Sequence, residues 1–159
     1  MDVRSGCPIN QAVEILGDRW SLVVLRDIMF GNLRTYGDLH RNSLEGIATN
    51  ILADRLKRLS DEELITSRPD PAHKQRTIYS LTEKAIALVP VMATLGTWGS
   101  HHLSPNPIYS ARALTLEKGG PTTWEAFADE LRHLHLGAIK PQRSVMAEMQ
   151  ASYLEAGGH

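Results

Sequence analysis

Residues 46–81 change their apolar spacing from a helical period to an alternating one, and this change limits the folds open to the chain. Up to Leu59 the apolar residues recur at helical spacing. After Leu64 the pattern alternates on both sides of a turn-forming run, in the segments ITSR at 65–68, PDPAHKQ at 69–75 and RTIYSL at 76–81. The sequence therefore predicts a short helix followed directly by a β-hairpin.

A helical wheel divides residues 48–59 into two faces. The apolar face predicts core contacts and holds Ala48, Ile51, Leu52, Leu56 and Leu59. The opposite face is small, polar and basic, and it holds Thr49, Asn50, Ala53 and Lys57. Small residues allow close approach to another surface, Thr and Asn can bond base edges, and Lys57 can reach a phosphate. Arg55 lies among the apolar residues, so an ion-pair role is preferred over base reading.

Three helices are expected before this point, over residues 9–17, 19–30 and 35–42, and the second is apolar enough to be the buried central helix. Three helices followed by a two-stranded wing make a winged helix-turn-helix. The fold class expected is mainly α with a small β-hairpin (α+β), and a helical extension follows.

Two further segments could contact DNA. The wing, residues 69–76, carries a basic tip of His73, Lys74 and Arg76, which either grips the DNA backbone or is simply a soluble turn. At the start of the third helix, Arg34, Thr35 and Tyr36 could present backbone N–H groups to a phosphate, or serve only as a helix cap.

Composition sets broad limits. The 159 residues, 42% of them hydrophobic, suffice for one core with an annex. Seventeen basic against 18 acidic residues give no sign of a polyanionic partner, although a dimer can carry a local basic face. No apolar run is long enough for a membrane span and residues 1–6 lack a signal-peptide core, so a soluble, cytoplasmic protein is expected. The lone cysteine agrees with a reducing compartment.

Several motifs occur in an order that resembles a known family. They are CP at 7–8, ILGDRWSLVVLRDIMFG at 15–31, RTYGDL at 34–39, GIATNILADRLKRL at 46–59, RTIYSLTEKA at 76–85 and LVPVMATLGTWG at 88–99. Together they resemble the HxlR-type winged helix-turn-helix regulators, which are relatives of the MarR group. The resemblance covers residues 7–102 and implies a dimeric, DNA-binding transcriptional regulator with this stretch as its DNA-binding and dimerisation domain.

The chain departs from the family pattern at both ends of the predicted reading helix. Members usually have Gly where Glu63 stands, and because a left-handed residue other than Gly costs about 1 kcal/mol, a different helix ending is expected. Members often have a Ser N-cap where Ala48 stands, which leaves Thr49 as an alternative cap.

The C-terminal part is expected to be helical. One helix over 83–99, bent at Pro90, would pair two subunits, as the resemblance implies. A linker at 104–109 precedes a helix with a capping box, Thr122 to Glu125, that runs through His135, and a last helix covers 141–156. The extension, residues 103–159, either enlarges the dimer interface, which is preferred, or roofs an effector pocket.

Other chemistries find little support. The histidine pairs have spacings that make no helical chelate, so no metal is expected, and the sequence contains no catalytic motif or cofactor fingerprint. Cys7 adjoins a helix start, an environment that activates thiols, but a structural role is preferred over redox sensing. The resemblance implies that some relatives use a cysteine at the matching position as a sensor.

Two functional hypotheses remain. The first is a homodimeric regulator, expected to be a repressor, that reads a palindromic operator in double-stranded DNA through residues 48–59 and 69–76 and responds to an unknown small molecule or to thiol stress. The second is a winged helix that binds another protein and has no affinity for DNA.

Overall fold

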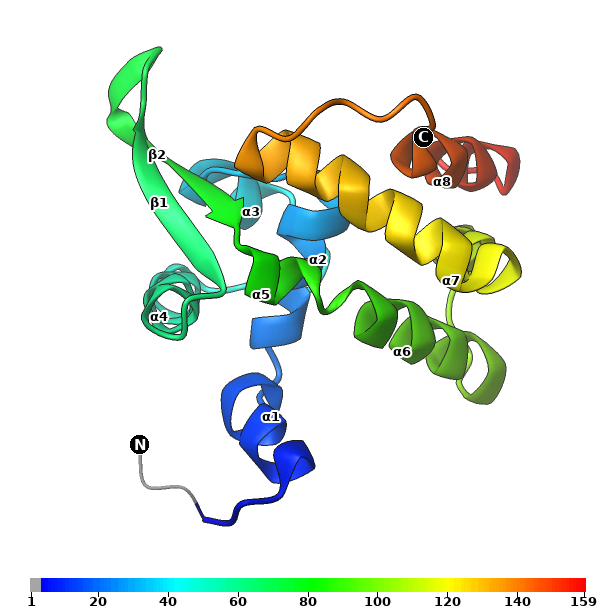
Figure 1. The fold of residues 1–159 in the computed structure, drawn as a ribbon, viewed down its shortest axis with the longest axis horizontal. Helices are drawn as coiled ribbons and strands as arrows, with labels where there is room; N and C mark the ends of the chain where they lie inside the picture. The colour runs from blue at the N-terminus through cyan, green and yellow to red at the C-terminus, as the bar shows by residue number, and fades with distance from the viewer. Residues whose placement is uncertain (1–3) are drawn as a thin grey trace. The chain divides into compact units, whose positions relative to one another are not determined.

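The computed structural model describes residues 4–159, so part of the expectation about residues 1–6 lies outside it. The chain divides into two compact units, residues 1–82 and 83–159. The first holds four helices and the hairpin, and the second is entirely helical over its described residues (Figure 1). The expected fold class is confirmed: a winged helix-turn-helix with C-terminal helices.

The first unit is built around its second helix. Its helices are α1 (Pro8–Leu16), α2 (Ser21–Gly31), α3 (Tyr36–Arg41) and α4 (Thr49–Asp61). Helix α2 ends at Asn32, which takes the left-handed conformation that closes helices well (φ 50°). The buried residues on these helices include Val24, Leu25, Ile28, Met29, Leu39, Leu52, Leu56 and Leu59. The prediction of a buried central helix is therefore confirmed.

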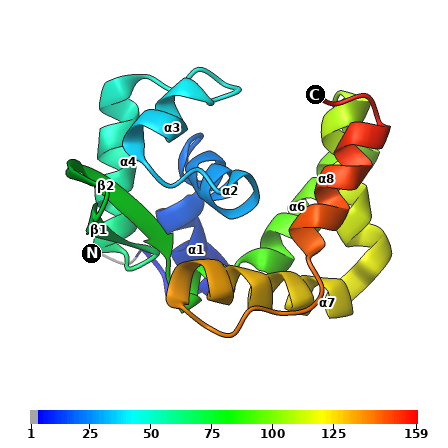
Figure 2. The same cartoon turned by 90° about the horizontal axis from the view of Figure 1, so that it is seen from above.

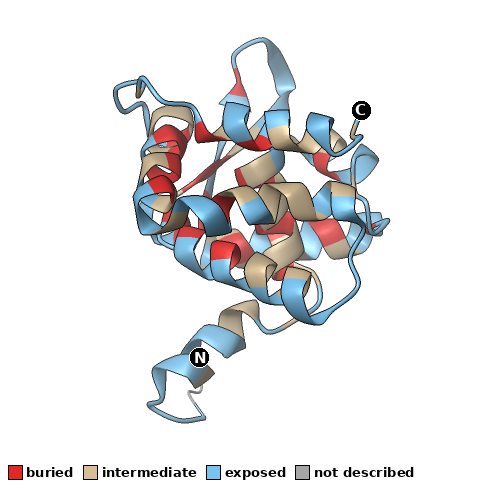
Figure 3. Cartoon of the chain, turned by 90° about the vertical axis from the view of Figure 1, so that its right-hand side faces the viewer, coloured by how far each residue is buried: buried red, intermediate tan, exposed pale blue. Residues whose placement is uncertain are grey.

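Helix α1 contributes no buried residue to this core. Its Ile9 and Val13 side chains are 74% and 49% exposed, although they form one apolar stripe. Figure 3 shows this helix in the colours of exposed and intermediate residues only.

Both ends of α4 differ from expectation. Ala48 is the N-cap, with an extended backbone and no side-chain cap, and Thr49 is the first helical residue, so Thr49 does not replace the missing cap. At the other end Glu63 adopts φ 59°. The expectation of a different helix ending is therefore wrong. The left-handed turn is present without glycine, and Glu63 adopts the conformation that is unfavourable for a residue with a Cβ atom.

The hairpin is longer and its turn shorter than predicted. Strands β1 (Ile65–Asp70) and β2 (His73–Leu81) pair antiparallel, so only residues 71–72 lie between them. The Asp70 carboxylate accepts hydrogen bonds from the Ala72 N–H at 2.9 Å and from Arg76 Nε at 2.6 Å, which closes the turn early. As a result His73, Lys74 and Arg76 lie on β2 rather than in a loop.

In the second unit the prediction of a single helix over residues 83–99 is wrong. Two helices stand there, α5 (Glu83–Ile86) and α6 (Val89–His102). Pro90 lies in the first turn of α6, where no intrahelical N–H donor is required, so it helps to start a helix instead of bending one.

The next helix, α7 (Pro107–Leu136), begins earlier than predicted. Asn106 caps it by accepting a hydrogen bond from the Ile108 N–H at 3.0 Å, which shortens the predicted linker. Gly120 interrupts the helix with φ 64° and ψ −163°, and Figure 2 shows the resulting bend. The prediction of a capping box at Thr122 is therefore wrong. The second half of α7 begins at Gly120 and Pro121, and the Glu125 carboxylate pairs with Arg132 at 3.0 Å.

The last helix, α8 (Val145–Glu155), lies along the first half of α7 (Figure 2). Val145 and Met149 are buried, Met146 and Tyr153 are half-buried, and the helix starts at its Ser144 cap rather than at residue 141. The Glu130 carboxylate, itself buried, accepts a hydrogen bond from the Met146 N–H at 2.9 Å. Among residues 4–159 no helix is long and apolar enough to cross a bilayer.

Candidate DNA-binding interface

The polar face predicted for the fourth helix is the face that α4 leaves open. Thr49, Asn50, Ala53 and Lys57 are all exposed. On the predicted apolar side Leu52, Leu56 and Leu59 are buried, Ile51 is half-buried and Ala48 is exposed. We call these four exposed residues the reading face. Their side chains are short near the N-terminus of α4, which allows its backbone to approach another surface closely.

Lys57 at the C-terminal end of the reading face has an acidic neighbour. Its Nζ lies 2.8 Å from a carboxylate oxygen of Asp61, one turn further along α4. This hydrogen bond and the charge of Asp61 raise the pKa of Lys57. Both side chains are well exposed, so the ammonium group can exchange the carboxylate for a phosphate at small cost.

Arg55 does not belong to the reading face. Its Nε donates to Asp18 at 2.9 Å and its Nη1 to Asp54 at 2.5 Å, and only 16% of its side chain is exposed. The preferred interpretation of this residue as an ion-pair partner is confirmed.

The three predicted residues at the start of α3 make hydrogen bonds within the first unit. The Thr35 hydroxyl caps the helix by accepting from the Asp38 N–H at 3.1 Å. The Tyr36 hydroxyl donates to the Thr49 carbonyl at 3.0 Å and so joins α3 to the first turn of α4. Arg34 donates to the Tyr79 carbonyl at 3.0 Å and to the Ser80 hydroxyl. Burial, and then the nearby charge of Arg68, lower the pKa of Arg34.

A cleft of about 330 Å³ separates α4 from the hairpin. It brings three of the sequence-predicted residues together with hydroxyl groups that the sequence reading missed, and it is lined by Tyr36, Ala53, Leu56, Lys57, Ser60, Asp61, Ser67 and Tyr79. Ser67 and Tyr79 are directly paired across the two strands. The alternation of the two strand segments was the signal that could have placed both on one face.

The basic residues of the wing divide into two groups. Arg76 is bound to the buried Asp70 carboxylate at 2.5 Å, which makes it part of the hairpin closure. Lys74 is exposed and makes no ion pair within residues 4–159, and the exposed His73 lies close enough to Asp70 to interact with its charge. Arg68 on β1, which was not predicted, is also exposed. The cations that the hairpin leaves exposed are therefore Arg68 and Lys74, with the His73 imidazole next to Lys74.

Residues 15–107, more than half of the chain, match the model of the HxlR-like helix-turn-helix family. The chain belongs to this family.

The HxlR-like segment has relatives among transcriptional regulators. An HTH-type transcriptional regulator of Mycobacterium tuberculosis is 35% identical over 102 residues, 64% of this chain and 62% of that protein. The regulator YodB of Bacillus subtilis is 30% identical over 100 residues, 62% of this chain and 88% of YodB. The chain thus spans somewhat less than two thirds of the mycobacterial relative. These relatives are regulators and not enzymes, and this chain is an HTH-type transcriptional regulator.

Solved structures agree with this assignment. The transcription factor PA1607 superposes with a TM-score of 0.59 at 31% identity and covers 64% of this chain and 69% of its own. A MarR-family regulator of Porphyromonas gingivalis gives 0.54 at 28% identity, over 62% of this chain and 95% of its own. The reduced form of YodB gives 0.52 at 26% identity, over 64% of this chain and 98% of YodB.

Cys7 precedes the matched HxlR-like segment and stands at the N-cap of α1. The residue is exposed, its carbonyl accepts the Gln11 N–H at 3.0 Å, and its thiol makes no cap hydrogen bond. It is the single cysteine of the chain. Any disulfide must therefore be formed with another molecule.

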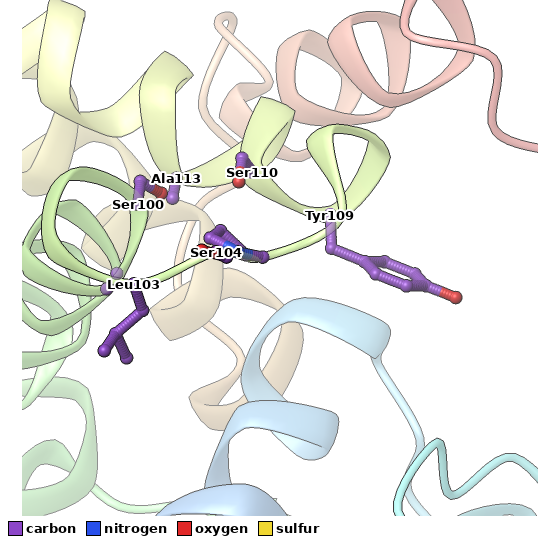
Figure 4. Close-up of a pocket in the computed structure, with 9 residues that line it drawn as sticks. Ser100, Leu103, Ser104, Tyr109, Ser110 and Ala113 are labelled. Atoms are coloured by element: carbon purple, nitrogen blue, oxygen red, sulfur yellow. The ribbon is translucent and has the colours of Figure 1, made fainter.

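Most of the extension lies beyond the HxlR-like segment, and a second hollow, of about 380 Å³, lies where α6 meets α7. Its lining is small and largely apolar: Gly96, Gly99, Ser100, Leu103, Ser104, Pro105, Tyr109, Ser110 and Ala113. In Figure 4 the Tyr109 ring points away from the other labelled residues. Among residues 4–159 no group of three metal-ligating side chains converges here or elsewhere.

Proposed function

We propose that the chain is a homodimeric, sequence-specific DNA-binding repressor that acts in the cytoplasm on a palindromic operator. The observation that carries this proposal is the reading face: Thr49, Asn50, Ala53 and Lys57 are presented together on a helix whose opposite side is fixed in the core. In this proposal the reading face enters a major groove, where Thr49 and Asn50 bond base edges and Lys57 a phosphate.

For the wing we propose a set of DNA contacts that differs from the one predicted from sequence. We place Lys74, His73 and Arg68 against the flanking DNA backbone, because Arg76 is held by Asp70 and Arg34 by β2. In this proposal Thr35, which caps α3, and Tyr36, which holds the first turn of α4, lie beside the DNA backbone. The hydroxyl-lined cleft next to Lys57 provides room for one phosphate.

Two exposed apolar surfaces support a dimer. On α6, Val91, Leu95 and Trp98 follow one another at helical spacing and are 46%, 48% and 54% exposed. On α1, Ile9 and Val13 are likewise exposed. Apolar stripes of this kind mark contacts between proteins, and a two-fold pair would present two reading faces to one duplex. In this proposal the extension enlarges the interface, with the hollow of Figure 4 as the alternative effector site.

The direct experiment measures DNA binding as a function of salt. Wild-type protein is expected to bind a duplex that it selects from a randomised pool, with an affinity that falls steeply as salt rises. Asn50→Ala with Lys57→Ala is expected to abolish selective binding, whereas Lys140→Ala, on an exposed loop, serves as the control. Salt-insensitive binding to another protein, with no DNA affinity, would instead show an interaction module.

A thiol response is a second candidate, favoured by the exposed Cys7 at a helix N-terminus and by the similarity to YodB. Diamide takes two electrons and two protons from a pair of thiols, so it is expected to join Cys7 to the Cys7 of a second copy by a disulfide. This is expected to weaken DNA binding of the wild type and to leave Cys7→Ser unchanged. Equal loss in both proteins would exclude Cys7 as the sensor.

A further inference from the structure

Asp18 occupies a junction between the central helix and the reading helix. It lies in the short connection between α1 and α2, and one of its oxygens accepts the N–H groups of Trp20 and Ser21 at 2.8 and 2.9 Å. Its other oxygen accepts the Ser21 hydroxyl at 2.5 Å. Asp18 therefore fixes the first turn of α2, the most buried helix of this unit.

The same carboxylate also holds α4. Arg55 Nε donates to it at 2.9 Å, and Arg58, one turn nearer the end of α4, brings Nη1 within 3.7 Å. With 16% and 22% of their side chains exposed, Arg55 and Asp18 form a half-buried pair. Burial opposes ionisation, but the hydrogen bonds from Ser21, Arg55 and two backbone N–H groups outweigh it and hold the pKa of Asp18 well below its usual range.

The position of Arg55 on α4 means that the Asp18–Arg55 pair can affect how this helix is oriented. Residue 55 follows Ala53 and precedes Lys57 of the reading face, yet its side chain is directed to the opposite side of the helix. A tether at this point fixes the rotation of α4 about its own axis. Base-edge contacts depend on that rotation, whereas contacts to phosphates tolerate small changes.

We infer that Asp18 is a positioning residue for DNA recognition: by holding Arg55 it sets the rotation of α4, and it thereby contributes to sequence selectivity without touching DNA. The inference rests on the proposed DNA-binding function, although the tether itself can be tested without DNA. No other described acid is bonded both to the start of α2 and to α4.

The test compares Asp18→Asn and Arg55→Met with the wild type. Asparagine keeps an oxygen for the Trp20 and Ser21 N–H groups but loses the charge, so α2 stays capped. The matched control is Asp54→Asn, which removes the exposed acid that shares Arg55. The DNA probes are a duplex that the wild type selects from a randomised pool and a scrambled duplex of equal length.

Asp18→Asn and Arg55→Met are each expected to lower the ratio of selected to scrambled affinity about tenfold, with the salt slope unchanged. Backbone amides of residues 56–61 should exchange about tenfold faster with solvent. The double variant should be no worse than the poorer single one, because both remove one interaction. Asp54→Asn should leave the ratio and the exchange unchanged.

Three results would overturn the inference: unchanged amide exchange in α4, an unchanged selectivity ratio, or a shallower salt slope in Arg55→Met, which would show that Arg55 contacts phosphate. A wild type that selects no duplex would refute the proposed function and the selectivity claim together. Amide exchange would in that case still decide whether Asp18 holds α4.

Discussion

At the scale of single residues, the left-handed turn after α4 stores a measurable strain. Glu63 adopts φ 59°, a conformation that costs a residue with a Cβ atom about 1 kcal/mol relative to glycine. Glu63→Gly is therefore expected to raise the free energy of unfolding by about 1 kcal/mol in urea denaturation. Glu62→Gly, where φ is −86°, is the control and should give no such gain. A loss of stability in Glu63→Gly would contradict the account.

The Asp18 carboxylate predicts a pH dependence of stability. Its pKa is lower in the folded chain than in the unfolded one, so the unfolded state binds more protons in acid. The stabilising contribution is present above about pH 4 and is lost progressively below it. Asp18→Asn should therefore show a smaller loss of unfolding free energy between neutral and acidic pH than the wild type. Ser21→Ala should reduce the pH dependence of the unfolding free energy less than Asp18→Asn does. An equal pH dependence in all three proteins would contradict the prediction.

At the scale of elements, the cleft between α4 and the hairpin contains an acid beside the proposed phosphate contact. The negative charge of Asp61 offsets the positive charge of Lys57, and it repels a phosphate that enters the cleft. Asp61→Asn is expected to strengthen DNA binding about two- to tenfold at low salt, and the gain should shrink as salt rises. Glu155→Gln changes net charge equally at the exposed end of α8 and should have little effect. The two are compared by fluorescence anisotropy on one duplex.

The elements also show what the sequence alone could provide. The helix-to-hairpin change at Leu59–Ile65 and the apolar circumference of α2 predicted the fold correctly, because both patterns are set by local period. Helix ends were less predictable. The side chains of Asn106 and Ser144 set two boundaries, and Gly120 set a third, through backbone conformations that apolar periodicity does not encode.

The candidate site was predictable to a similar degree. The reading face followed from a wheel, since exposure on a half-buried helix depends on position alone. The hydrogen bond of Arg34 to β2 and the ion pair of Arg76 with Asp70 could not be predicted from the sequence. Both are tertiary contacts, and the sequence identifies the two residues only as cations. Ser67 and Tyr79 needed the strand register before they could be placed together.

At the scale of the whole molecule, the exposed stripe of α6 predicts self-association. Leu95→Glu places a charge in the middle of this stripe and is expected to convert a dimer to a monomer in sedimentation experiments. Ile139→Glu, at a loop position that is 94% exposed, is the matched control and should stay dimeric. A Leu95→Glu protein with the wild-type mass would show that this stripe does not pair subunits.

The most direct measurement of the central claim is a footprint of the wild-type protein on the duplex that it selects from a randomised pool. If two copies present their reading faces together, protection should fall on two inverted half-sites whose centres lie about 10 base pairs, one helical turn, apart. Asn50→Ala should lose protection at bases in both halves alike. A single protected site, or protection that is indifferent to Asn50 and Lys57, would contradict the account.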